Sequence, residues 1–272
     1  AHMTNIAGTH LEGFGSLEGV ANAKAELWLG LREDGKAIVN LDDPLIPGRV
    51  HVSNRQQFIG ISAEGKSSAG YRIEDYQEQG LLGSVFTLVH PLGKQLIKLP
   101  LPGRHNAANA LAAAAMAMEA GADGLAVAAG LAEMQSVKGR LVIRKGKQGS
   151  VILDDSYNAS PASFRAAVEV LKQQSGIRIV VAGDMAELGA EQYSAHIGLG
   201  EYIRDQGIEL LFGSGELTRL AIKAFGSKGI FTTSNEELAA LILPCLNADV
   251  TVLVKGSRSA GMERVVKQLI LQ

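Results

Sequence analysis

The sequence predicts an α/β protein in which two regions of different pattern follow one another. From residue 141 onward, apolar strand segments alternate with amphipathic helix segments, which is typical of a mostly parallel sheet covered on both faces. Before that point, short β-rich runs lie among Gly, Ser and Asn residues and suggest small antiparallel strands. We therefore expect a mixed region of small strands and helices over residues 4–140 and a complete α/β domain over residues 141–272.

The composition excludes several classes of protein. The chain has 272 residues, 46% of them hydrophobic and 20% charged, as in an ordinary globular protein. Its net charge is −2 and no run of Lys or Arg stands out, so we expect no nucleic-acid or membrane-surface partner. No stretch suits a membrane span or a signal peptide, and the first three residues, "AHM", resemble a cloning scar. The single cysteine, Cys245, lies in an apolar stretch, which predicts a buried thiol in a reducing compartment.

The first region carries helical segments on either side of its β-rich middle. Residues 16–31 suit a helix capped by Ser16, and residues 36–43 read as a strand. Residues 105–135 turn helical again.

The second region reads as five strands with a helix after each. Ser160 and Pro161 form a cap followed by proline at the first helical position, and "SNEE" from Ser234 has capping-box spacing. The expected strands are "SVILDD", "IRIVVAG", "IELLFG", "GIFTT" and "VTVLVKG". The expected helices are "PASFRAAVEVLKQQ", "YSAHIGLGEYIRDQ", "ELTRLAIKAF", "NEELAALILPCL" and "MERVVKQLIL".

Residues 60–67, "GISAEGKS", match the pattern of a phosphate-binding loop. In such a loop, backbone amides surround the phosphates, Lys66 would reach the terminal ones and Ser67 would meet magnesium. The pattern needs a core strand before it and a helix after it, and neither flanking sequence fits. We therefore interpret this segment as a hairpin loop, with phosphate binding as the weaker alternative.

Lys24 and His10 are candidate reactive residues near the start of the chain. On a helix, Lys24 shares its stripe with four apolar side chains, Val20, Leu27, Trp28 and Leu31. A buried amine there would have a lowered pKa and could react with a carbonyl group or with carbon dioxide, giving a metal-binding carbamate. The alternative is an ordinary lysine that extends its ammonium to water. His10, with Glu12 nearby, suits a metal ligand, a proton acceptor or a structural histidine.

His105, Asn106 and Asn109 stand at the start of a predicted helix in "LPGRHNAANALAAAA". An asparagine amide offers a donor beside an acceptor, which matches one edge of adenine. Asn106 could instead simply cap the helix. Asn109 falls within an alanine-rich stripe, where a buried amide would need partners.

Polar residues follow three predicted strands of the second region. Parallel strands end at one edge of a sheet, where open α/β sheets bind ligands, so we expect these loops to form one binding surface. Carboxylates there can hold ribose hydroxyls or an amine, and cations suit a carboxylate or phosphate. A plain turn is the alternative for the first loop. The residues are Asp154, Asp155, Ser156, Tyr157 and Asn158, then Asp184 and Glu187, then Lys255, Ser257 and Arg258.

Six segments together resemble the Mur ligases, most closely the MurF type. They are "TNIAGTHLEGFGSLEGVANAKAE", "LPGRHNAANALAAA", "KGRL", "DDSYNASP", "GDMAELG" and "VLVKGSRSAGMERVV", in the family's order. The resemblance implies part of a central ATPase domain followed by a whole Rossmann-like C-terminal domain. It also implies a bacterial cytoplasmic ligase that uses ATP and Mg²⁺ to add D-alanyl-D-alanine to UDP-N-acetylmuramoyl-tripeptide for peptidoglycan. The expected route is formation of an acyl phosphate, attack by the amine and loss of phosphate.

The resemblance implies a role for each candidate residue. His10 and a carbamylated Lys24 would bind magnesium at the reacting centre. Nucleotide-binding residues would be His105, Asn106, Asn109, Arg140 and Asp155. Substrate-facing residues would be Tyr157, Asn158, Asp184, Glu187, Lys255, Ser257 and Arg258.

The beginning of the chain departs from the family pattern. A MurF-type enzyme has a UDP-sugar-binding domain, a phosphate loop and a metal-binding glutamate, none of which precedes Thr4. We therefore expect an inactive fragment that binds ATP weakly at best. Its central part would expose unpaired sheet edges and favour self-association, whereas the parent would be a monomer.

Two other classes of protein stay open. One is a ligase for a different amino acid or peptide, such as another Mur ligase or a folylpolyglutamate synthase, although "GDMAELG" and "KGSR" argue against it. The other is a non-catalytic nucleotide-binding module, or an NTPase built on residues 60–67.

Overall fold

The computed structural model of the chain describes residues 1–8, 11–53 and 55–271, which form two compact units. The N-terminal unit comprises Ala1–Ala7 and Phe14–Gln135, and the C-terminal unit comprises Gly8–Gly13 and Ser136–Gln272. The division after Gln135 falls shortly before the domain boundary expected after residue 140. No helix among the described residues is long and apolar enough to cross a membrane.

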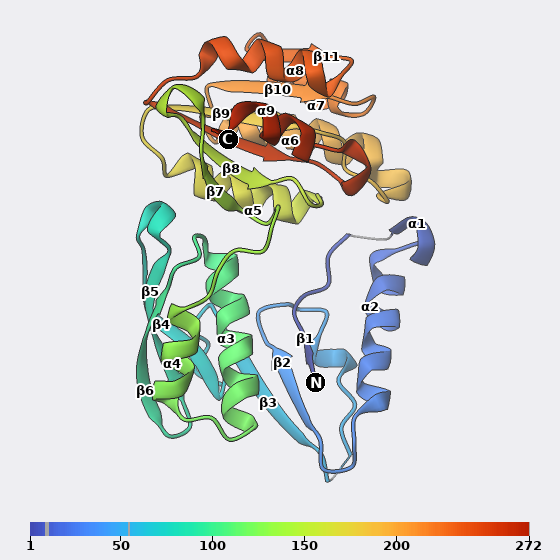
Figure 1. Cartoon of the computed structure of the whole chain (residues 1–272). Helices are drawn as coiled ribbons and strands as arrows, with labels where there is room; N and C mark the ends of the chain where they lie inside the picture. The colour runs from blue at the N-terminus through green and yellow to red at the C-terminus, as the bar shows by residue number, and fades with distance from the viewer. Residues whose placement is uncertain (9–10, 54, 272) are drawn as a thin grey trace. The chain divides into compact units, whose positions relative to one another are not determined.

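A six-stranded mixed sheet forms the centre of the N-terminal unit (Figure 1). Its strands lie in chain order: β1 (His2–Met3), β2 (Lys36–Asn40), β3 (Gln57–Ser62), β4 (Tyr71–Glu78), β5 (Ser84–His90) and β6 (Gly93–Leu99). The pairings from β1 to β4 are parallel, whereas β4, β5 and β6 pair antiparallel. The expected antiparallel strands are therefore confirmed for β4 to β6 and wrong for β3, which pairs in parallel with both neighbours.

The first strand consists of residues that the sequence had suggested to be a cloning scar. Met3 is buried, and the His2 ring nitrogen Nδ1 lies 2.9 Å from the carbonyl oxygen of Ile38. Both residues pair in register with β2. Setting residues 1–3 aside was therefore wrong for the fold, because two of them extend the sheet.

Two helices of the N-terminal unit, α2 (Leu17–Ala25) and α4 (Gly124–Ala132), begin at side-chain caps. Helix α3 (Arg104–Glu119) lies between them in the chain, α2 continues into a 3₁₀ helix (Glu26–Gly30), and the short α1 (Leu11–Phe14) precedes all three. The predicted cap Ser16 is confirmed, since its Oγ accepts from the Gly19 amide at 3.0 Å. The helix expected over residues 105–135 is divided, because Gly121 turns the chain with a φ of 104° and Asp123 caps α4. Small alanine side chains of α3 pack into a core with residues such as Ile38, Phe86 and Leu88.

The C-terminal unit is an α/β structure built on a second six-stranded sheet (Figure 1). Its strand order is β11-β10-β9-β12-β8-β7. The strands are β7 (Val142–Lys145), β8 (Val151–Asp155), β9 (Ile177–Ala182), β10 (Leu210–Ser214), β11 (Gly229–Thr232) and β12 (Val250–Lys255). Strands β8 to β12 are mutually parallel and confirm the five predicted strands, whereas β7 pairs antiparallel with β8 and was missed. Its residues are mostly exposed, so β7 lacks the apolar pattern of a core strand.

Helices cover both faces of this sheet, as the alternation of segments predicts. They are α5 (Pro161–Lys172), α6 (Gln192–Asp205), α7 (Thr218–Phe225), α8 (Asn235–Ile242) and α9 (Glu263–Leu269). One face packs on α8 and α9 through a core that includes Ile152, Phe212 and Val252. The other face packs on α5, which adjoins α6, which in turn adjoins α7.

Local signals fixed two of these helix starts correctly. Ser160 forms a capping box with Ser163, with Pro161 in the first turn of α5. Ser234 caps α8 by accepting from the Glu237 amide. The prediction of a buried thiol at Cys245 is wrong, because this residue lies in a short 3₁₀ helix after α8 and is half-buried.

Candidate functional site

The carboxyl edge of the C-terminal sheet gathers the loops that the sequence selected. Lys255 at the end of β12 stands directly opposite Asp155 of β8 on one side and Ala182 of β9 on the other. The loops that begin at residues 156, 183 and 256 therefore leave three neighbouring strands at the same edge. The expectation of adjacent polar loops is confirmed within this unit.

A buried ion pair lies at the centre of this edge. Lys255 is 2% exposed, and its Nζ donates to Asp155 Oδ2 at 2.5 Å and to the carbonyl oxygen of Asn158 at 2.9 Å. The other carboxylate oxygen of Asp155 accepts from the Leu141 amide at 3.0 Å. Burial lowers the pKa of Lys255, and the attraction of Asp155 opposes that shift. Lys255 therefore orients two other candidate residues, and a direct contact with substrate stays a prediction.

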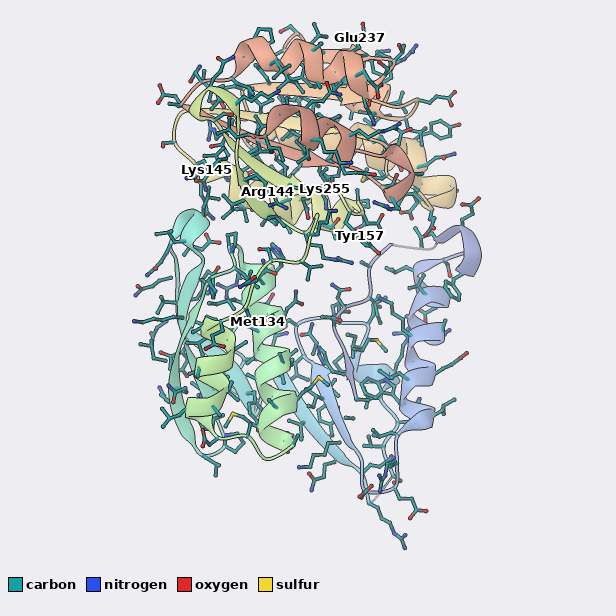
Figure 2. All side chains as sticks on the ribbon, in the orientation of Figure 1. Met134, Arg144, Lys145, Tyr157, Glu237 and Lys255 are labelled. Atoms are coloured by element: carbon teal, nitrogen blue, oxygen red, sulfur yellow. The ribbon has the colours of Figure 1, made fainter. Side chains whose placement is uncertain are left out.

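Two guanidinium groups lie near the ring of Tyr157, which follows Asp155 by two residues. The guanidinium carbon of Arg140 lies 4.6 Å from the centre of the Tyr157 ring, and that of Arg258 lies 6.0 Å from it. The ring is 45% exposed, and the Tyr157 amide donates to the carbonyl of Gly139 at 3.0 Å. Figure 2 shows Tyr157 and Lys255 on the same side of the unit. An exposed aromatic face held by cations can receive a planar ring with anionic groups beside it.

Asp184 and Ser257 fix the neighbouring loops. Asp184 Oδ1 accepts from the Thr218 amide at 2.7 Å and from Thr218 Oγ1 at 2.6 Å, so it holds the first residue of α7. Its carbonyl accepts from the Ser257 amide at 2.8 Å. Ser257 is 1% exposed, so its side chain faces the interior. Glu187 is exposed and has a left-handed φ of 62°, and a role of either acid toward an amine stays a prediction.

His196 is a structural element of this edge that the sequence analysis did not select. It lies on α6, is fully buried, and its Nε2 accepts from the Met185 amide at 3.0 Å. Its Nδ1 lies 2.6 Å from the Gln192 carbonyl, so Nδ1 carries the proton that makes this bond. The imidazole thus ties the "GDMAELG" loop to α6. Its spacing of eleven residues from Met185 gave no pattern that would single it out.

Lys24 differs from its predicted surroundings. Val20 and Trp28 are buried as expected, but Leu27 is 42% exposed, because the chain passes into a 3₁₀ helix after Ala25 and the stripe rotates. Lys24 itself is half-buried, and its Nζ donates to the Asn5 carbonyl at 2.9 Å. The expectation of a buried amine is therefore wrong. His10, its expected partner at the metal, lies outside the described residues.

The predicted nucleotide residues of the N-terminal unit lie in the first turns of α3. Gly103, with a φ of 91°, is the residue before the helix, so the interpretation of Asn106 as the cap is wrong. The side-chain nitrogen Nδ2 of Asn106 instead donates to the Pro102 carbonyl at 2.8 Å. Asn109 is exposed, which contradicts the expectation of a buried amide, and His105 is exposed beside it. A role of these residues in nucleotide binding stays a prediction.

The carboxylate of Asp42 occupies hydrogen-bond donors of residues 60–67, the segment that resembles a phosphate loop. Asp42, after β2, accepts from Ser62 Oγ at 2.7 Å and from the amides of Ala63 at 2.6 Å and Glu64 at 3.1 Å. Lys66 Nζ donates to the Leu41 carbonyl at 2.6 Å and lies 3.4 Å from Asp42 Oδ1. The loop thus already holds an anion of its own chain. It also joins two parallel strands, β3 and β4, so the loop interpretation is confirmed and the hairpin is wrong.

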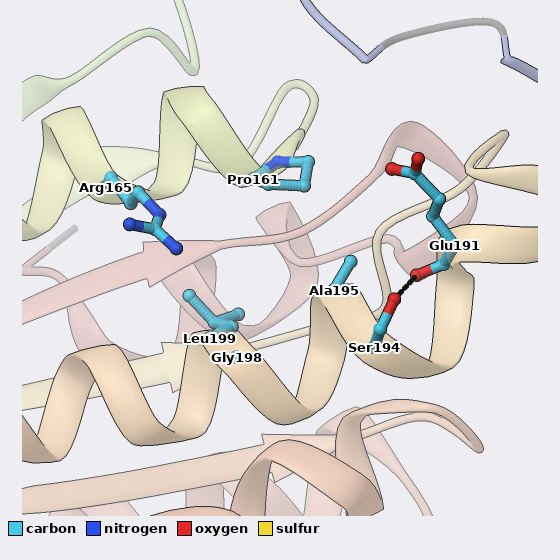
Figure 3. Close-up of a pocket in the computed structure, with 7 residues that line it drawn as sticks. All are labelled: Pro161, Arg165, Glu191, Ser194, Ala195, Gly198 and Leu199. Atoms are coloured by element: carbon cyan, nitrogen blue, oxygen red, sulfur yellow. Dashed lines mark hydrogen bonds between the residues drawn. The ribbon is translucent and has the colours of Figure 1, made fainter. Parts of the chain in front are cut away.

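Within the described residues, no group of three or more His, Cys, Asp or Glu side chains could hold a metal ion. A shallow pocket of about 230 Å³ lies between α5 and α6, and Ser194 Oγ donates to the Glu191 carbonyl at its rim (Figure 3). None of the predicted site residues is among the described residues that line it.

Models of two Mur ligase domains match the chain. The Mur ligase middle domain matches residues 1–117, and the Mur ligase glutamate ligase domain matches residues 139–258. The chain belongs to the Mur ligase family. Residues 1–3 fall within the first match, in agreement with their place in the sheet.

Curated relatives of this Mur ligase chain include UDP-N-acetylmuramoyl-tripeptide–D-alanyl-D-alanine ligases. The protein of Escherichia coli K12 is 42% identical over 274 residues, and that of Haemophilus influenzae is 38% identical over 278 residues. Each alignment covers 99% of this chain, which spans 59% and 58% of the length of these relatives.

Solved structures of the same family resemble the whole fold. A MurF structure from Acinetobacter baumannii has a TM-score of 0.89 and 28% identity over 98% of this chain, and 58% of that protein is covered. MurF ligase from Thermotoga maritima in complex with ADP has a TM-score of 0.78 and 25% identity, and 62% of it is covered. A folylpolyglutamate synthase from Mycobacterium tuberculosis, at 19% identity and a TM-score of 0.75, shares the fold.

Proposed function

We propose that this chain forms part of an ATP-dependent ligase that adds D-alanyl-D-alanine to UDP-N-acetylmuramoyl-tripeptide. Relatives that bear this name align with 99% of the chain. The loops "GDMAELG" and "KGSR", which favour the MurF type over other Mur ligases, adjoin one another at the carboxyl edge of the C-terminal sheet. A bacterial cytoplasmic location and a place in peptidoglycan synthesis accompany this activity.

The observation that carries the proposal is the arrangement around Asp155. Lys255 and the Leu141 amide each hold one of its oxygens, so the carboxylate has a fixed direction before any ligand arrives. Tyr157, which is 45% exposed, lies at the same edge with the guanidinium groups of Arg140 and Arg258 near its ring. Preorganised charges and an aromatic face cost little rearrangement on binding.

These residues fit a nucleotide that carries phosphates. Asp155 retains acceptor capacity for ribose hydroxyls, and Arg140 is exposed and suited to a phosphate. His105, Asn106 and Asn109 of α3 keep their proposed role in nucleotide binding. Tyr157, Asn158, Asp184, Glu187, Lys255, Ser257 and Arg258 would bind or position the peptide substrates. ATP, when bound, supplies the phosphoryl group that activates the tripeptide carboxylate as an acyl phosphate.

Magnesium belongs to the same proposal. When bound, it offsets the negative charge of the phosphates. Lys24 would become a magnesium ligand only after carbamylation. The ammonium of Lys24 now donates to the Asn5 carbonyl, and carbamylation would convert it into an anionic group. Since Lys24 is half-buried, carbon dioxide can reach its amine. His10 keeps its proposed role as the second ligand.

Calorimetry with Mg-ATP tests the proposal on the chain itself. We expect weak binding that Asp155→Asn and Arg140→Gln each reduce by about tenfold, in keeping with the loss of a hydrogen-bonded or charged contact. Arg219→Gln is the matched control, because Arg219 also stacks on a ring, that of Phe231 at 4.5 Å, at a different strand. Affinity that survives both test substitutions would contradict the proposed nucleotide site.

Ligase activity is a separate measurement. We expect no product when the chain alone is given UDP-N-acetylmuramoyl-tripeptide, D-alanyl-D-alanine and Mg-ATP, because Asp42 occupies its phosphate-loop-like segment. Incorporation of D-alanyl-D-alanine by the chain alone would overturn this expectation. Incorporation of a different amino acid would favour another ligase of the family.

A further inference from the structure

Strand β7, at one edge of the C-terminal sheet, lies in a strongly basic stretch of the chain. Between Glu133 and Asp154 the sequence has no acidic residue, although the net charge of the whole chain is −2. The same stretch holds five cations, which we call the basic edge: Lys138, Arg140, Arg144, Lys145 and Lys147. Figure 2 labels Arg144 and Lys145, the two that belong to β7.

Acidic side chains of the described residues do not neutralise the charges of the basic edge. Within the part of the chain that the structure describes, none of the five cations forms an ion pair, and four of them are exposed. The nearest carboxylates of β8 are occupied, since Asp154 Oδ1 accepts from Ser156 Oγ at 2.6 Å and Asp155 pairs with Lys255. The basic edge therefore presents positive charge to a partner.

The backbone of β7 is also open to a partner. Residues near the C-terminus of the chain already bond to the C-terminal end of β7. Gly146 forms an antiparallel bridge with Ile270, and the Leu271 amide donates to the Lys145 carbonyl at 3.1 Å. Residues two apart in an antiparallel strand face the same edge, so the amide and carbonyl of Ile143 also point outward. No bond of Ile143 outside the β7–β8 pairing occurs among the described residues, and its side chain is 40% exposed.

The directions of the side chains restrict the shape of the partner. Arg144 pairs with Ile152, which faces the core under α8 and α9, whereas Lys145 pairs with Val151 and points to the other face. A flat anionic surface laid on either face would meet only one of them. A narrow chain that runs along the edge would meet both.

We propose that β7 is a docking edge for an extended acidic peptide, which adds to the sheet as a further strand beside Ile143. The backbone of Ile143 would supply hydrogen bonds, and the basic edge would select Glu and Asp side chains on both faces of the added strand. The short antiparallel contact of Ile270 and Leu271 shows that this edge accepts a strand in that direction. The proposal rests on β7 and its cations Arg144 and Lys145, which have no part in the proposed nucleotide site, although Arg140 of the basic edge is shared with that site.

A short synthetic peptide of alternating Glu and Val, titrated into the chain and followed by amide NMR, tests the proposal. We expect shifts confined to β7 and its flanks, and affinity that falls about tenfold when ionic strength rises from about 0.05 to about 0.5 M. The matching Gln and Val peptide should bind at least about tenfold more weakly, because it keeps the backbone and loses the charge. Equal binding of both peptides would overturn the charge selection.

Two variants separate the charge from the backbone. Arg144→Gln with Lys145→Gln should weaken binding about tenfold, whereas Lys223→Gln with Lys228→Gln, the same charge change at two exposed lysines near α7, should not. Ile143→Pro removes the outward amide, which the β7–β8 pairing does not use, and should abolish binding while the fold persists. If Ile143→Pro binds the peptide as well as the wild type does, charge alone holds the peptide, and the proposal that it adds to the sheet as a strand is refuted.

Other partners give distinct results. Binding to phosphatidylglycerol vesicles without binding to the acidic peptide would overturn the proposal in favour of a lipid surface. If the chain binds neither and the Arg144→Gln, Lys145→Gln variant self-associates, the cations serve only to keep sheet edges apart, and the proposal fails.

Discussion

Two lysine–aspartate pairs, one in each unit, have the same chemistry and opposite consequences. Lys66 lies 3.4 Å from Asp42, and its side chain is 43% exposed. Lys255 lies 2.5 Å from Asp155, and its side chain is 3% exposed. The first pair closes a loop whose sequence matches a phosphate-binding pattern, and the second supports an edge where no short pattern predicts the pair. The two pairs consist of the same residue types. They differ in the exposure of the lysine and in the backbone groups that the aspartate binds, and these differences decide which pair belongs to a candidate site.

Removal of the buried lysine should have the largest effect. Lys255→Met leaves Asp155 without its cation, and breaking a buried ion pair costs about 3–5 kcal/mol of unfolding free energy. Urea unfolding followed by amide exchange of β8 and β12 measures the loss. Lys66→Met, the matched change at the exposed pair, should cost at most about 1 kcal/mol in the N-terminal unit. Equal losses in the two variants would remove the distinction between the pairs.

Removal of the exposed pair's carboxylate should have an intermediate effect. Asp42→Ala deprives Ser62 Oγ and the amides of Ala63 and Glu64 of their acceptor, and unpaired donors cost about 1–3 kcal/mol. Trp28, the single tryptophan and 3% exposed, reports unfolding of this unit by fluorescence. Glu64→Gln changes a carboxylate in the same loop that faces solvent and should leave stability unchanged. A stable Asp42→Ala protein would show that the loop does not depend on its internal anion.

The pH dependence of a third ion pair should show a smaller effect. Burial raises the pKa of Glu209, but hydrogen bonds from Arg178 outweigh it and the net shift is downward. Because the folded state keeps this carboxylate ionised to lower pH, its stabilisation is complete above the unfolded pKa of about 4.3 and disappears as pH falls through the folded pKa. Glu209→Gln should therefore be less stable than the wild type by about 1 kcal/mol at neutral pH and equal to it in acid. Parallel stability curves from neutral to acid pH would refute this assignment.

The smallest expected effect concerns nucleotide affinity. Lys66→Met should leave binding of Mg-ATP unchanged, because Lys66 donates to the Leu41 carbonyl and its loop amides are already occupied. The same calorimetry on Arg140→Gln provides the contrasting loss. A clear loss in Lys66→Met would return residues 60–67 to the list of nucleotide sites.

Prediction of the fold succeeded where the signal is local. The strands β8 to β12 follow from runs of apolar residues, and the starts of α2, α5 and α8 follow from Ser16, Ser160 and Ser234. It failed where neighbours far apart in the chain decide. The parallel partner of β3 and the edge strand β7 are examples, since neither carries a pattern that names its partner.

Prediction of the site shows the same division. The loops at residues 154–158, 183–188 and 255–258 were selected because polar residues follow apolar strands. The contacts within these loops were not predicted, since the pair of Lys255 with Asp155 joins residues that lie 100 positions apart in the sequence. His196 was missed for a similar reason, and the basic edge was missed because apolar residues and glycines interrupt its cations, which form no run longer than Arg144 and Lys145.

The sequence by itself determined the α/β class, the α/β pattern of the second region and the family to which the chain belongs, because periodicity, caps and loop motifs are properties of neighbouring residues. Only the tertiary structure decided that Asp42 fills the phosphate-loop pattern, that Lys24 is half-buried and that Lys255 orients Asp155. Burial and pairing depend on contacts between distant segments, and these contacts determine which charged groups remain available to a ligand.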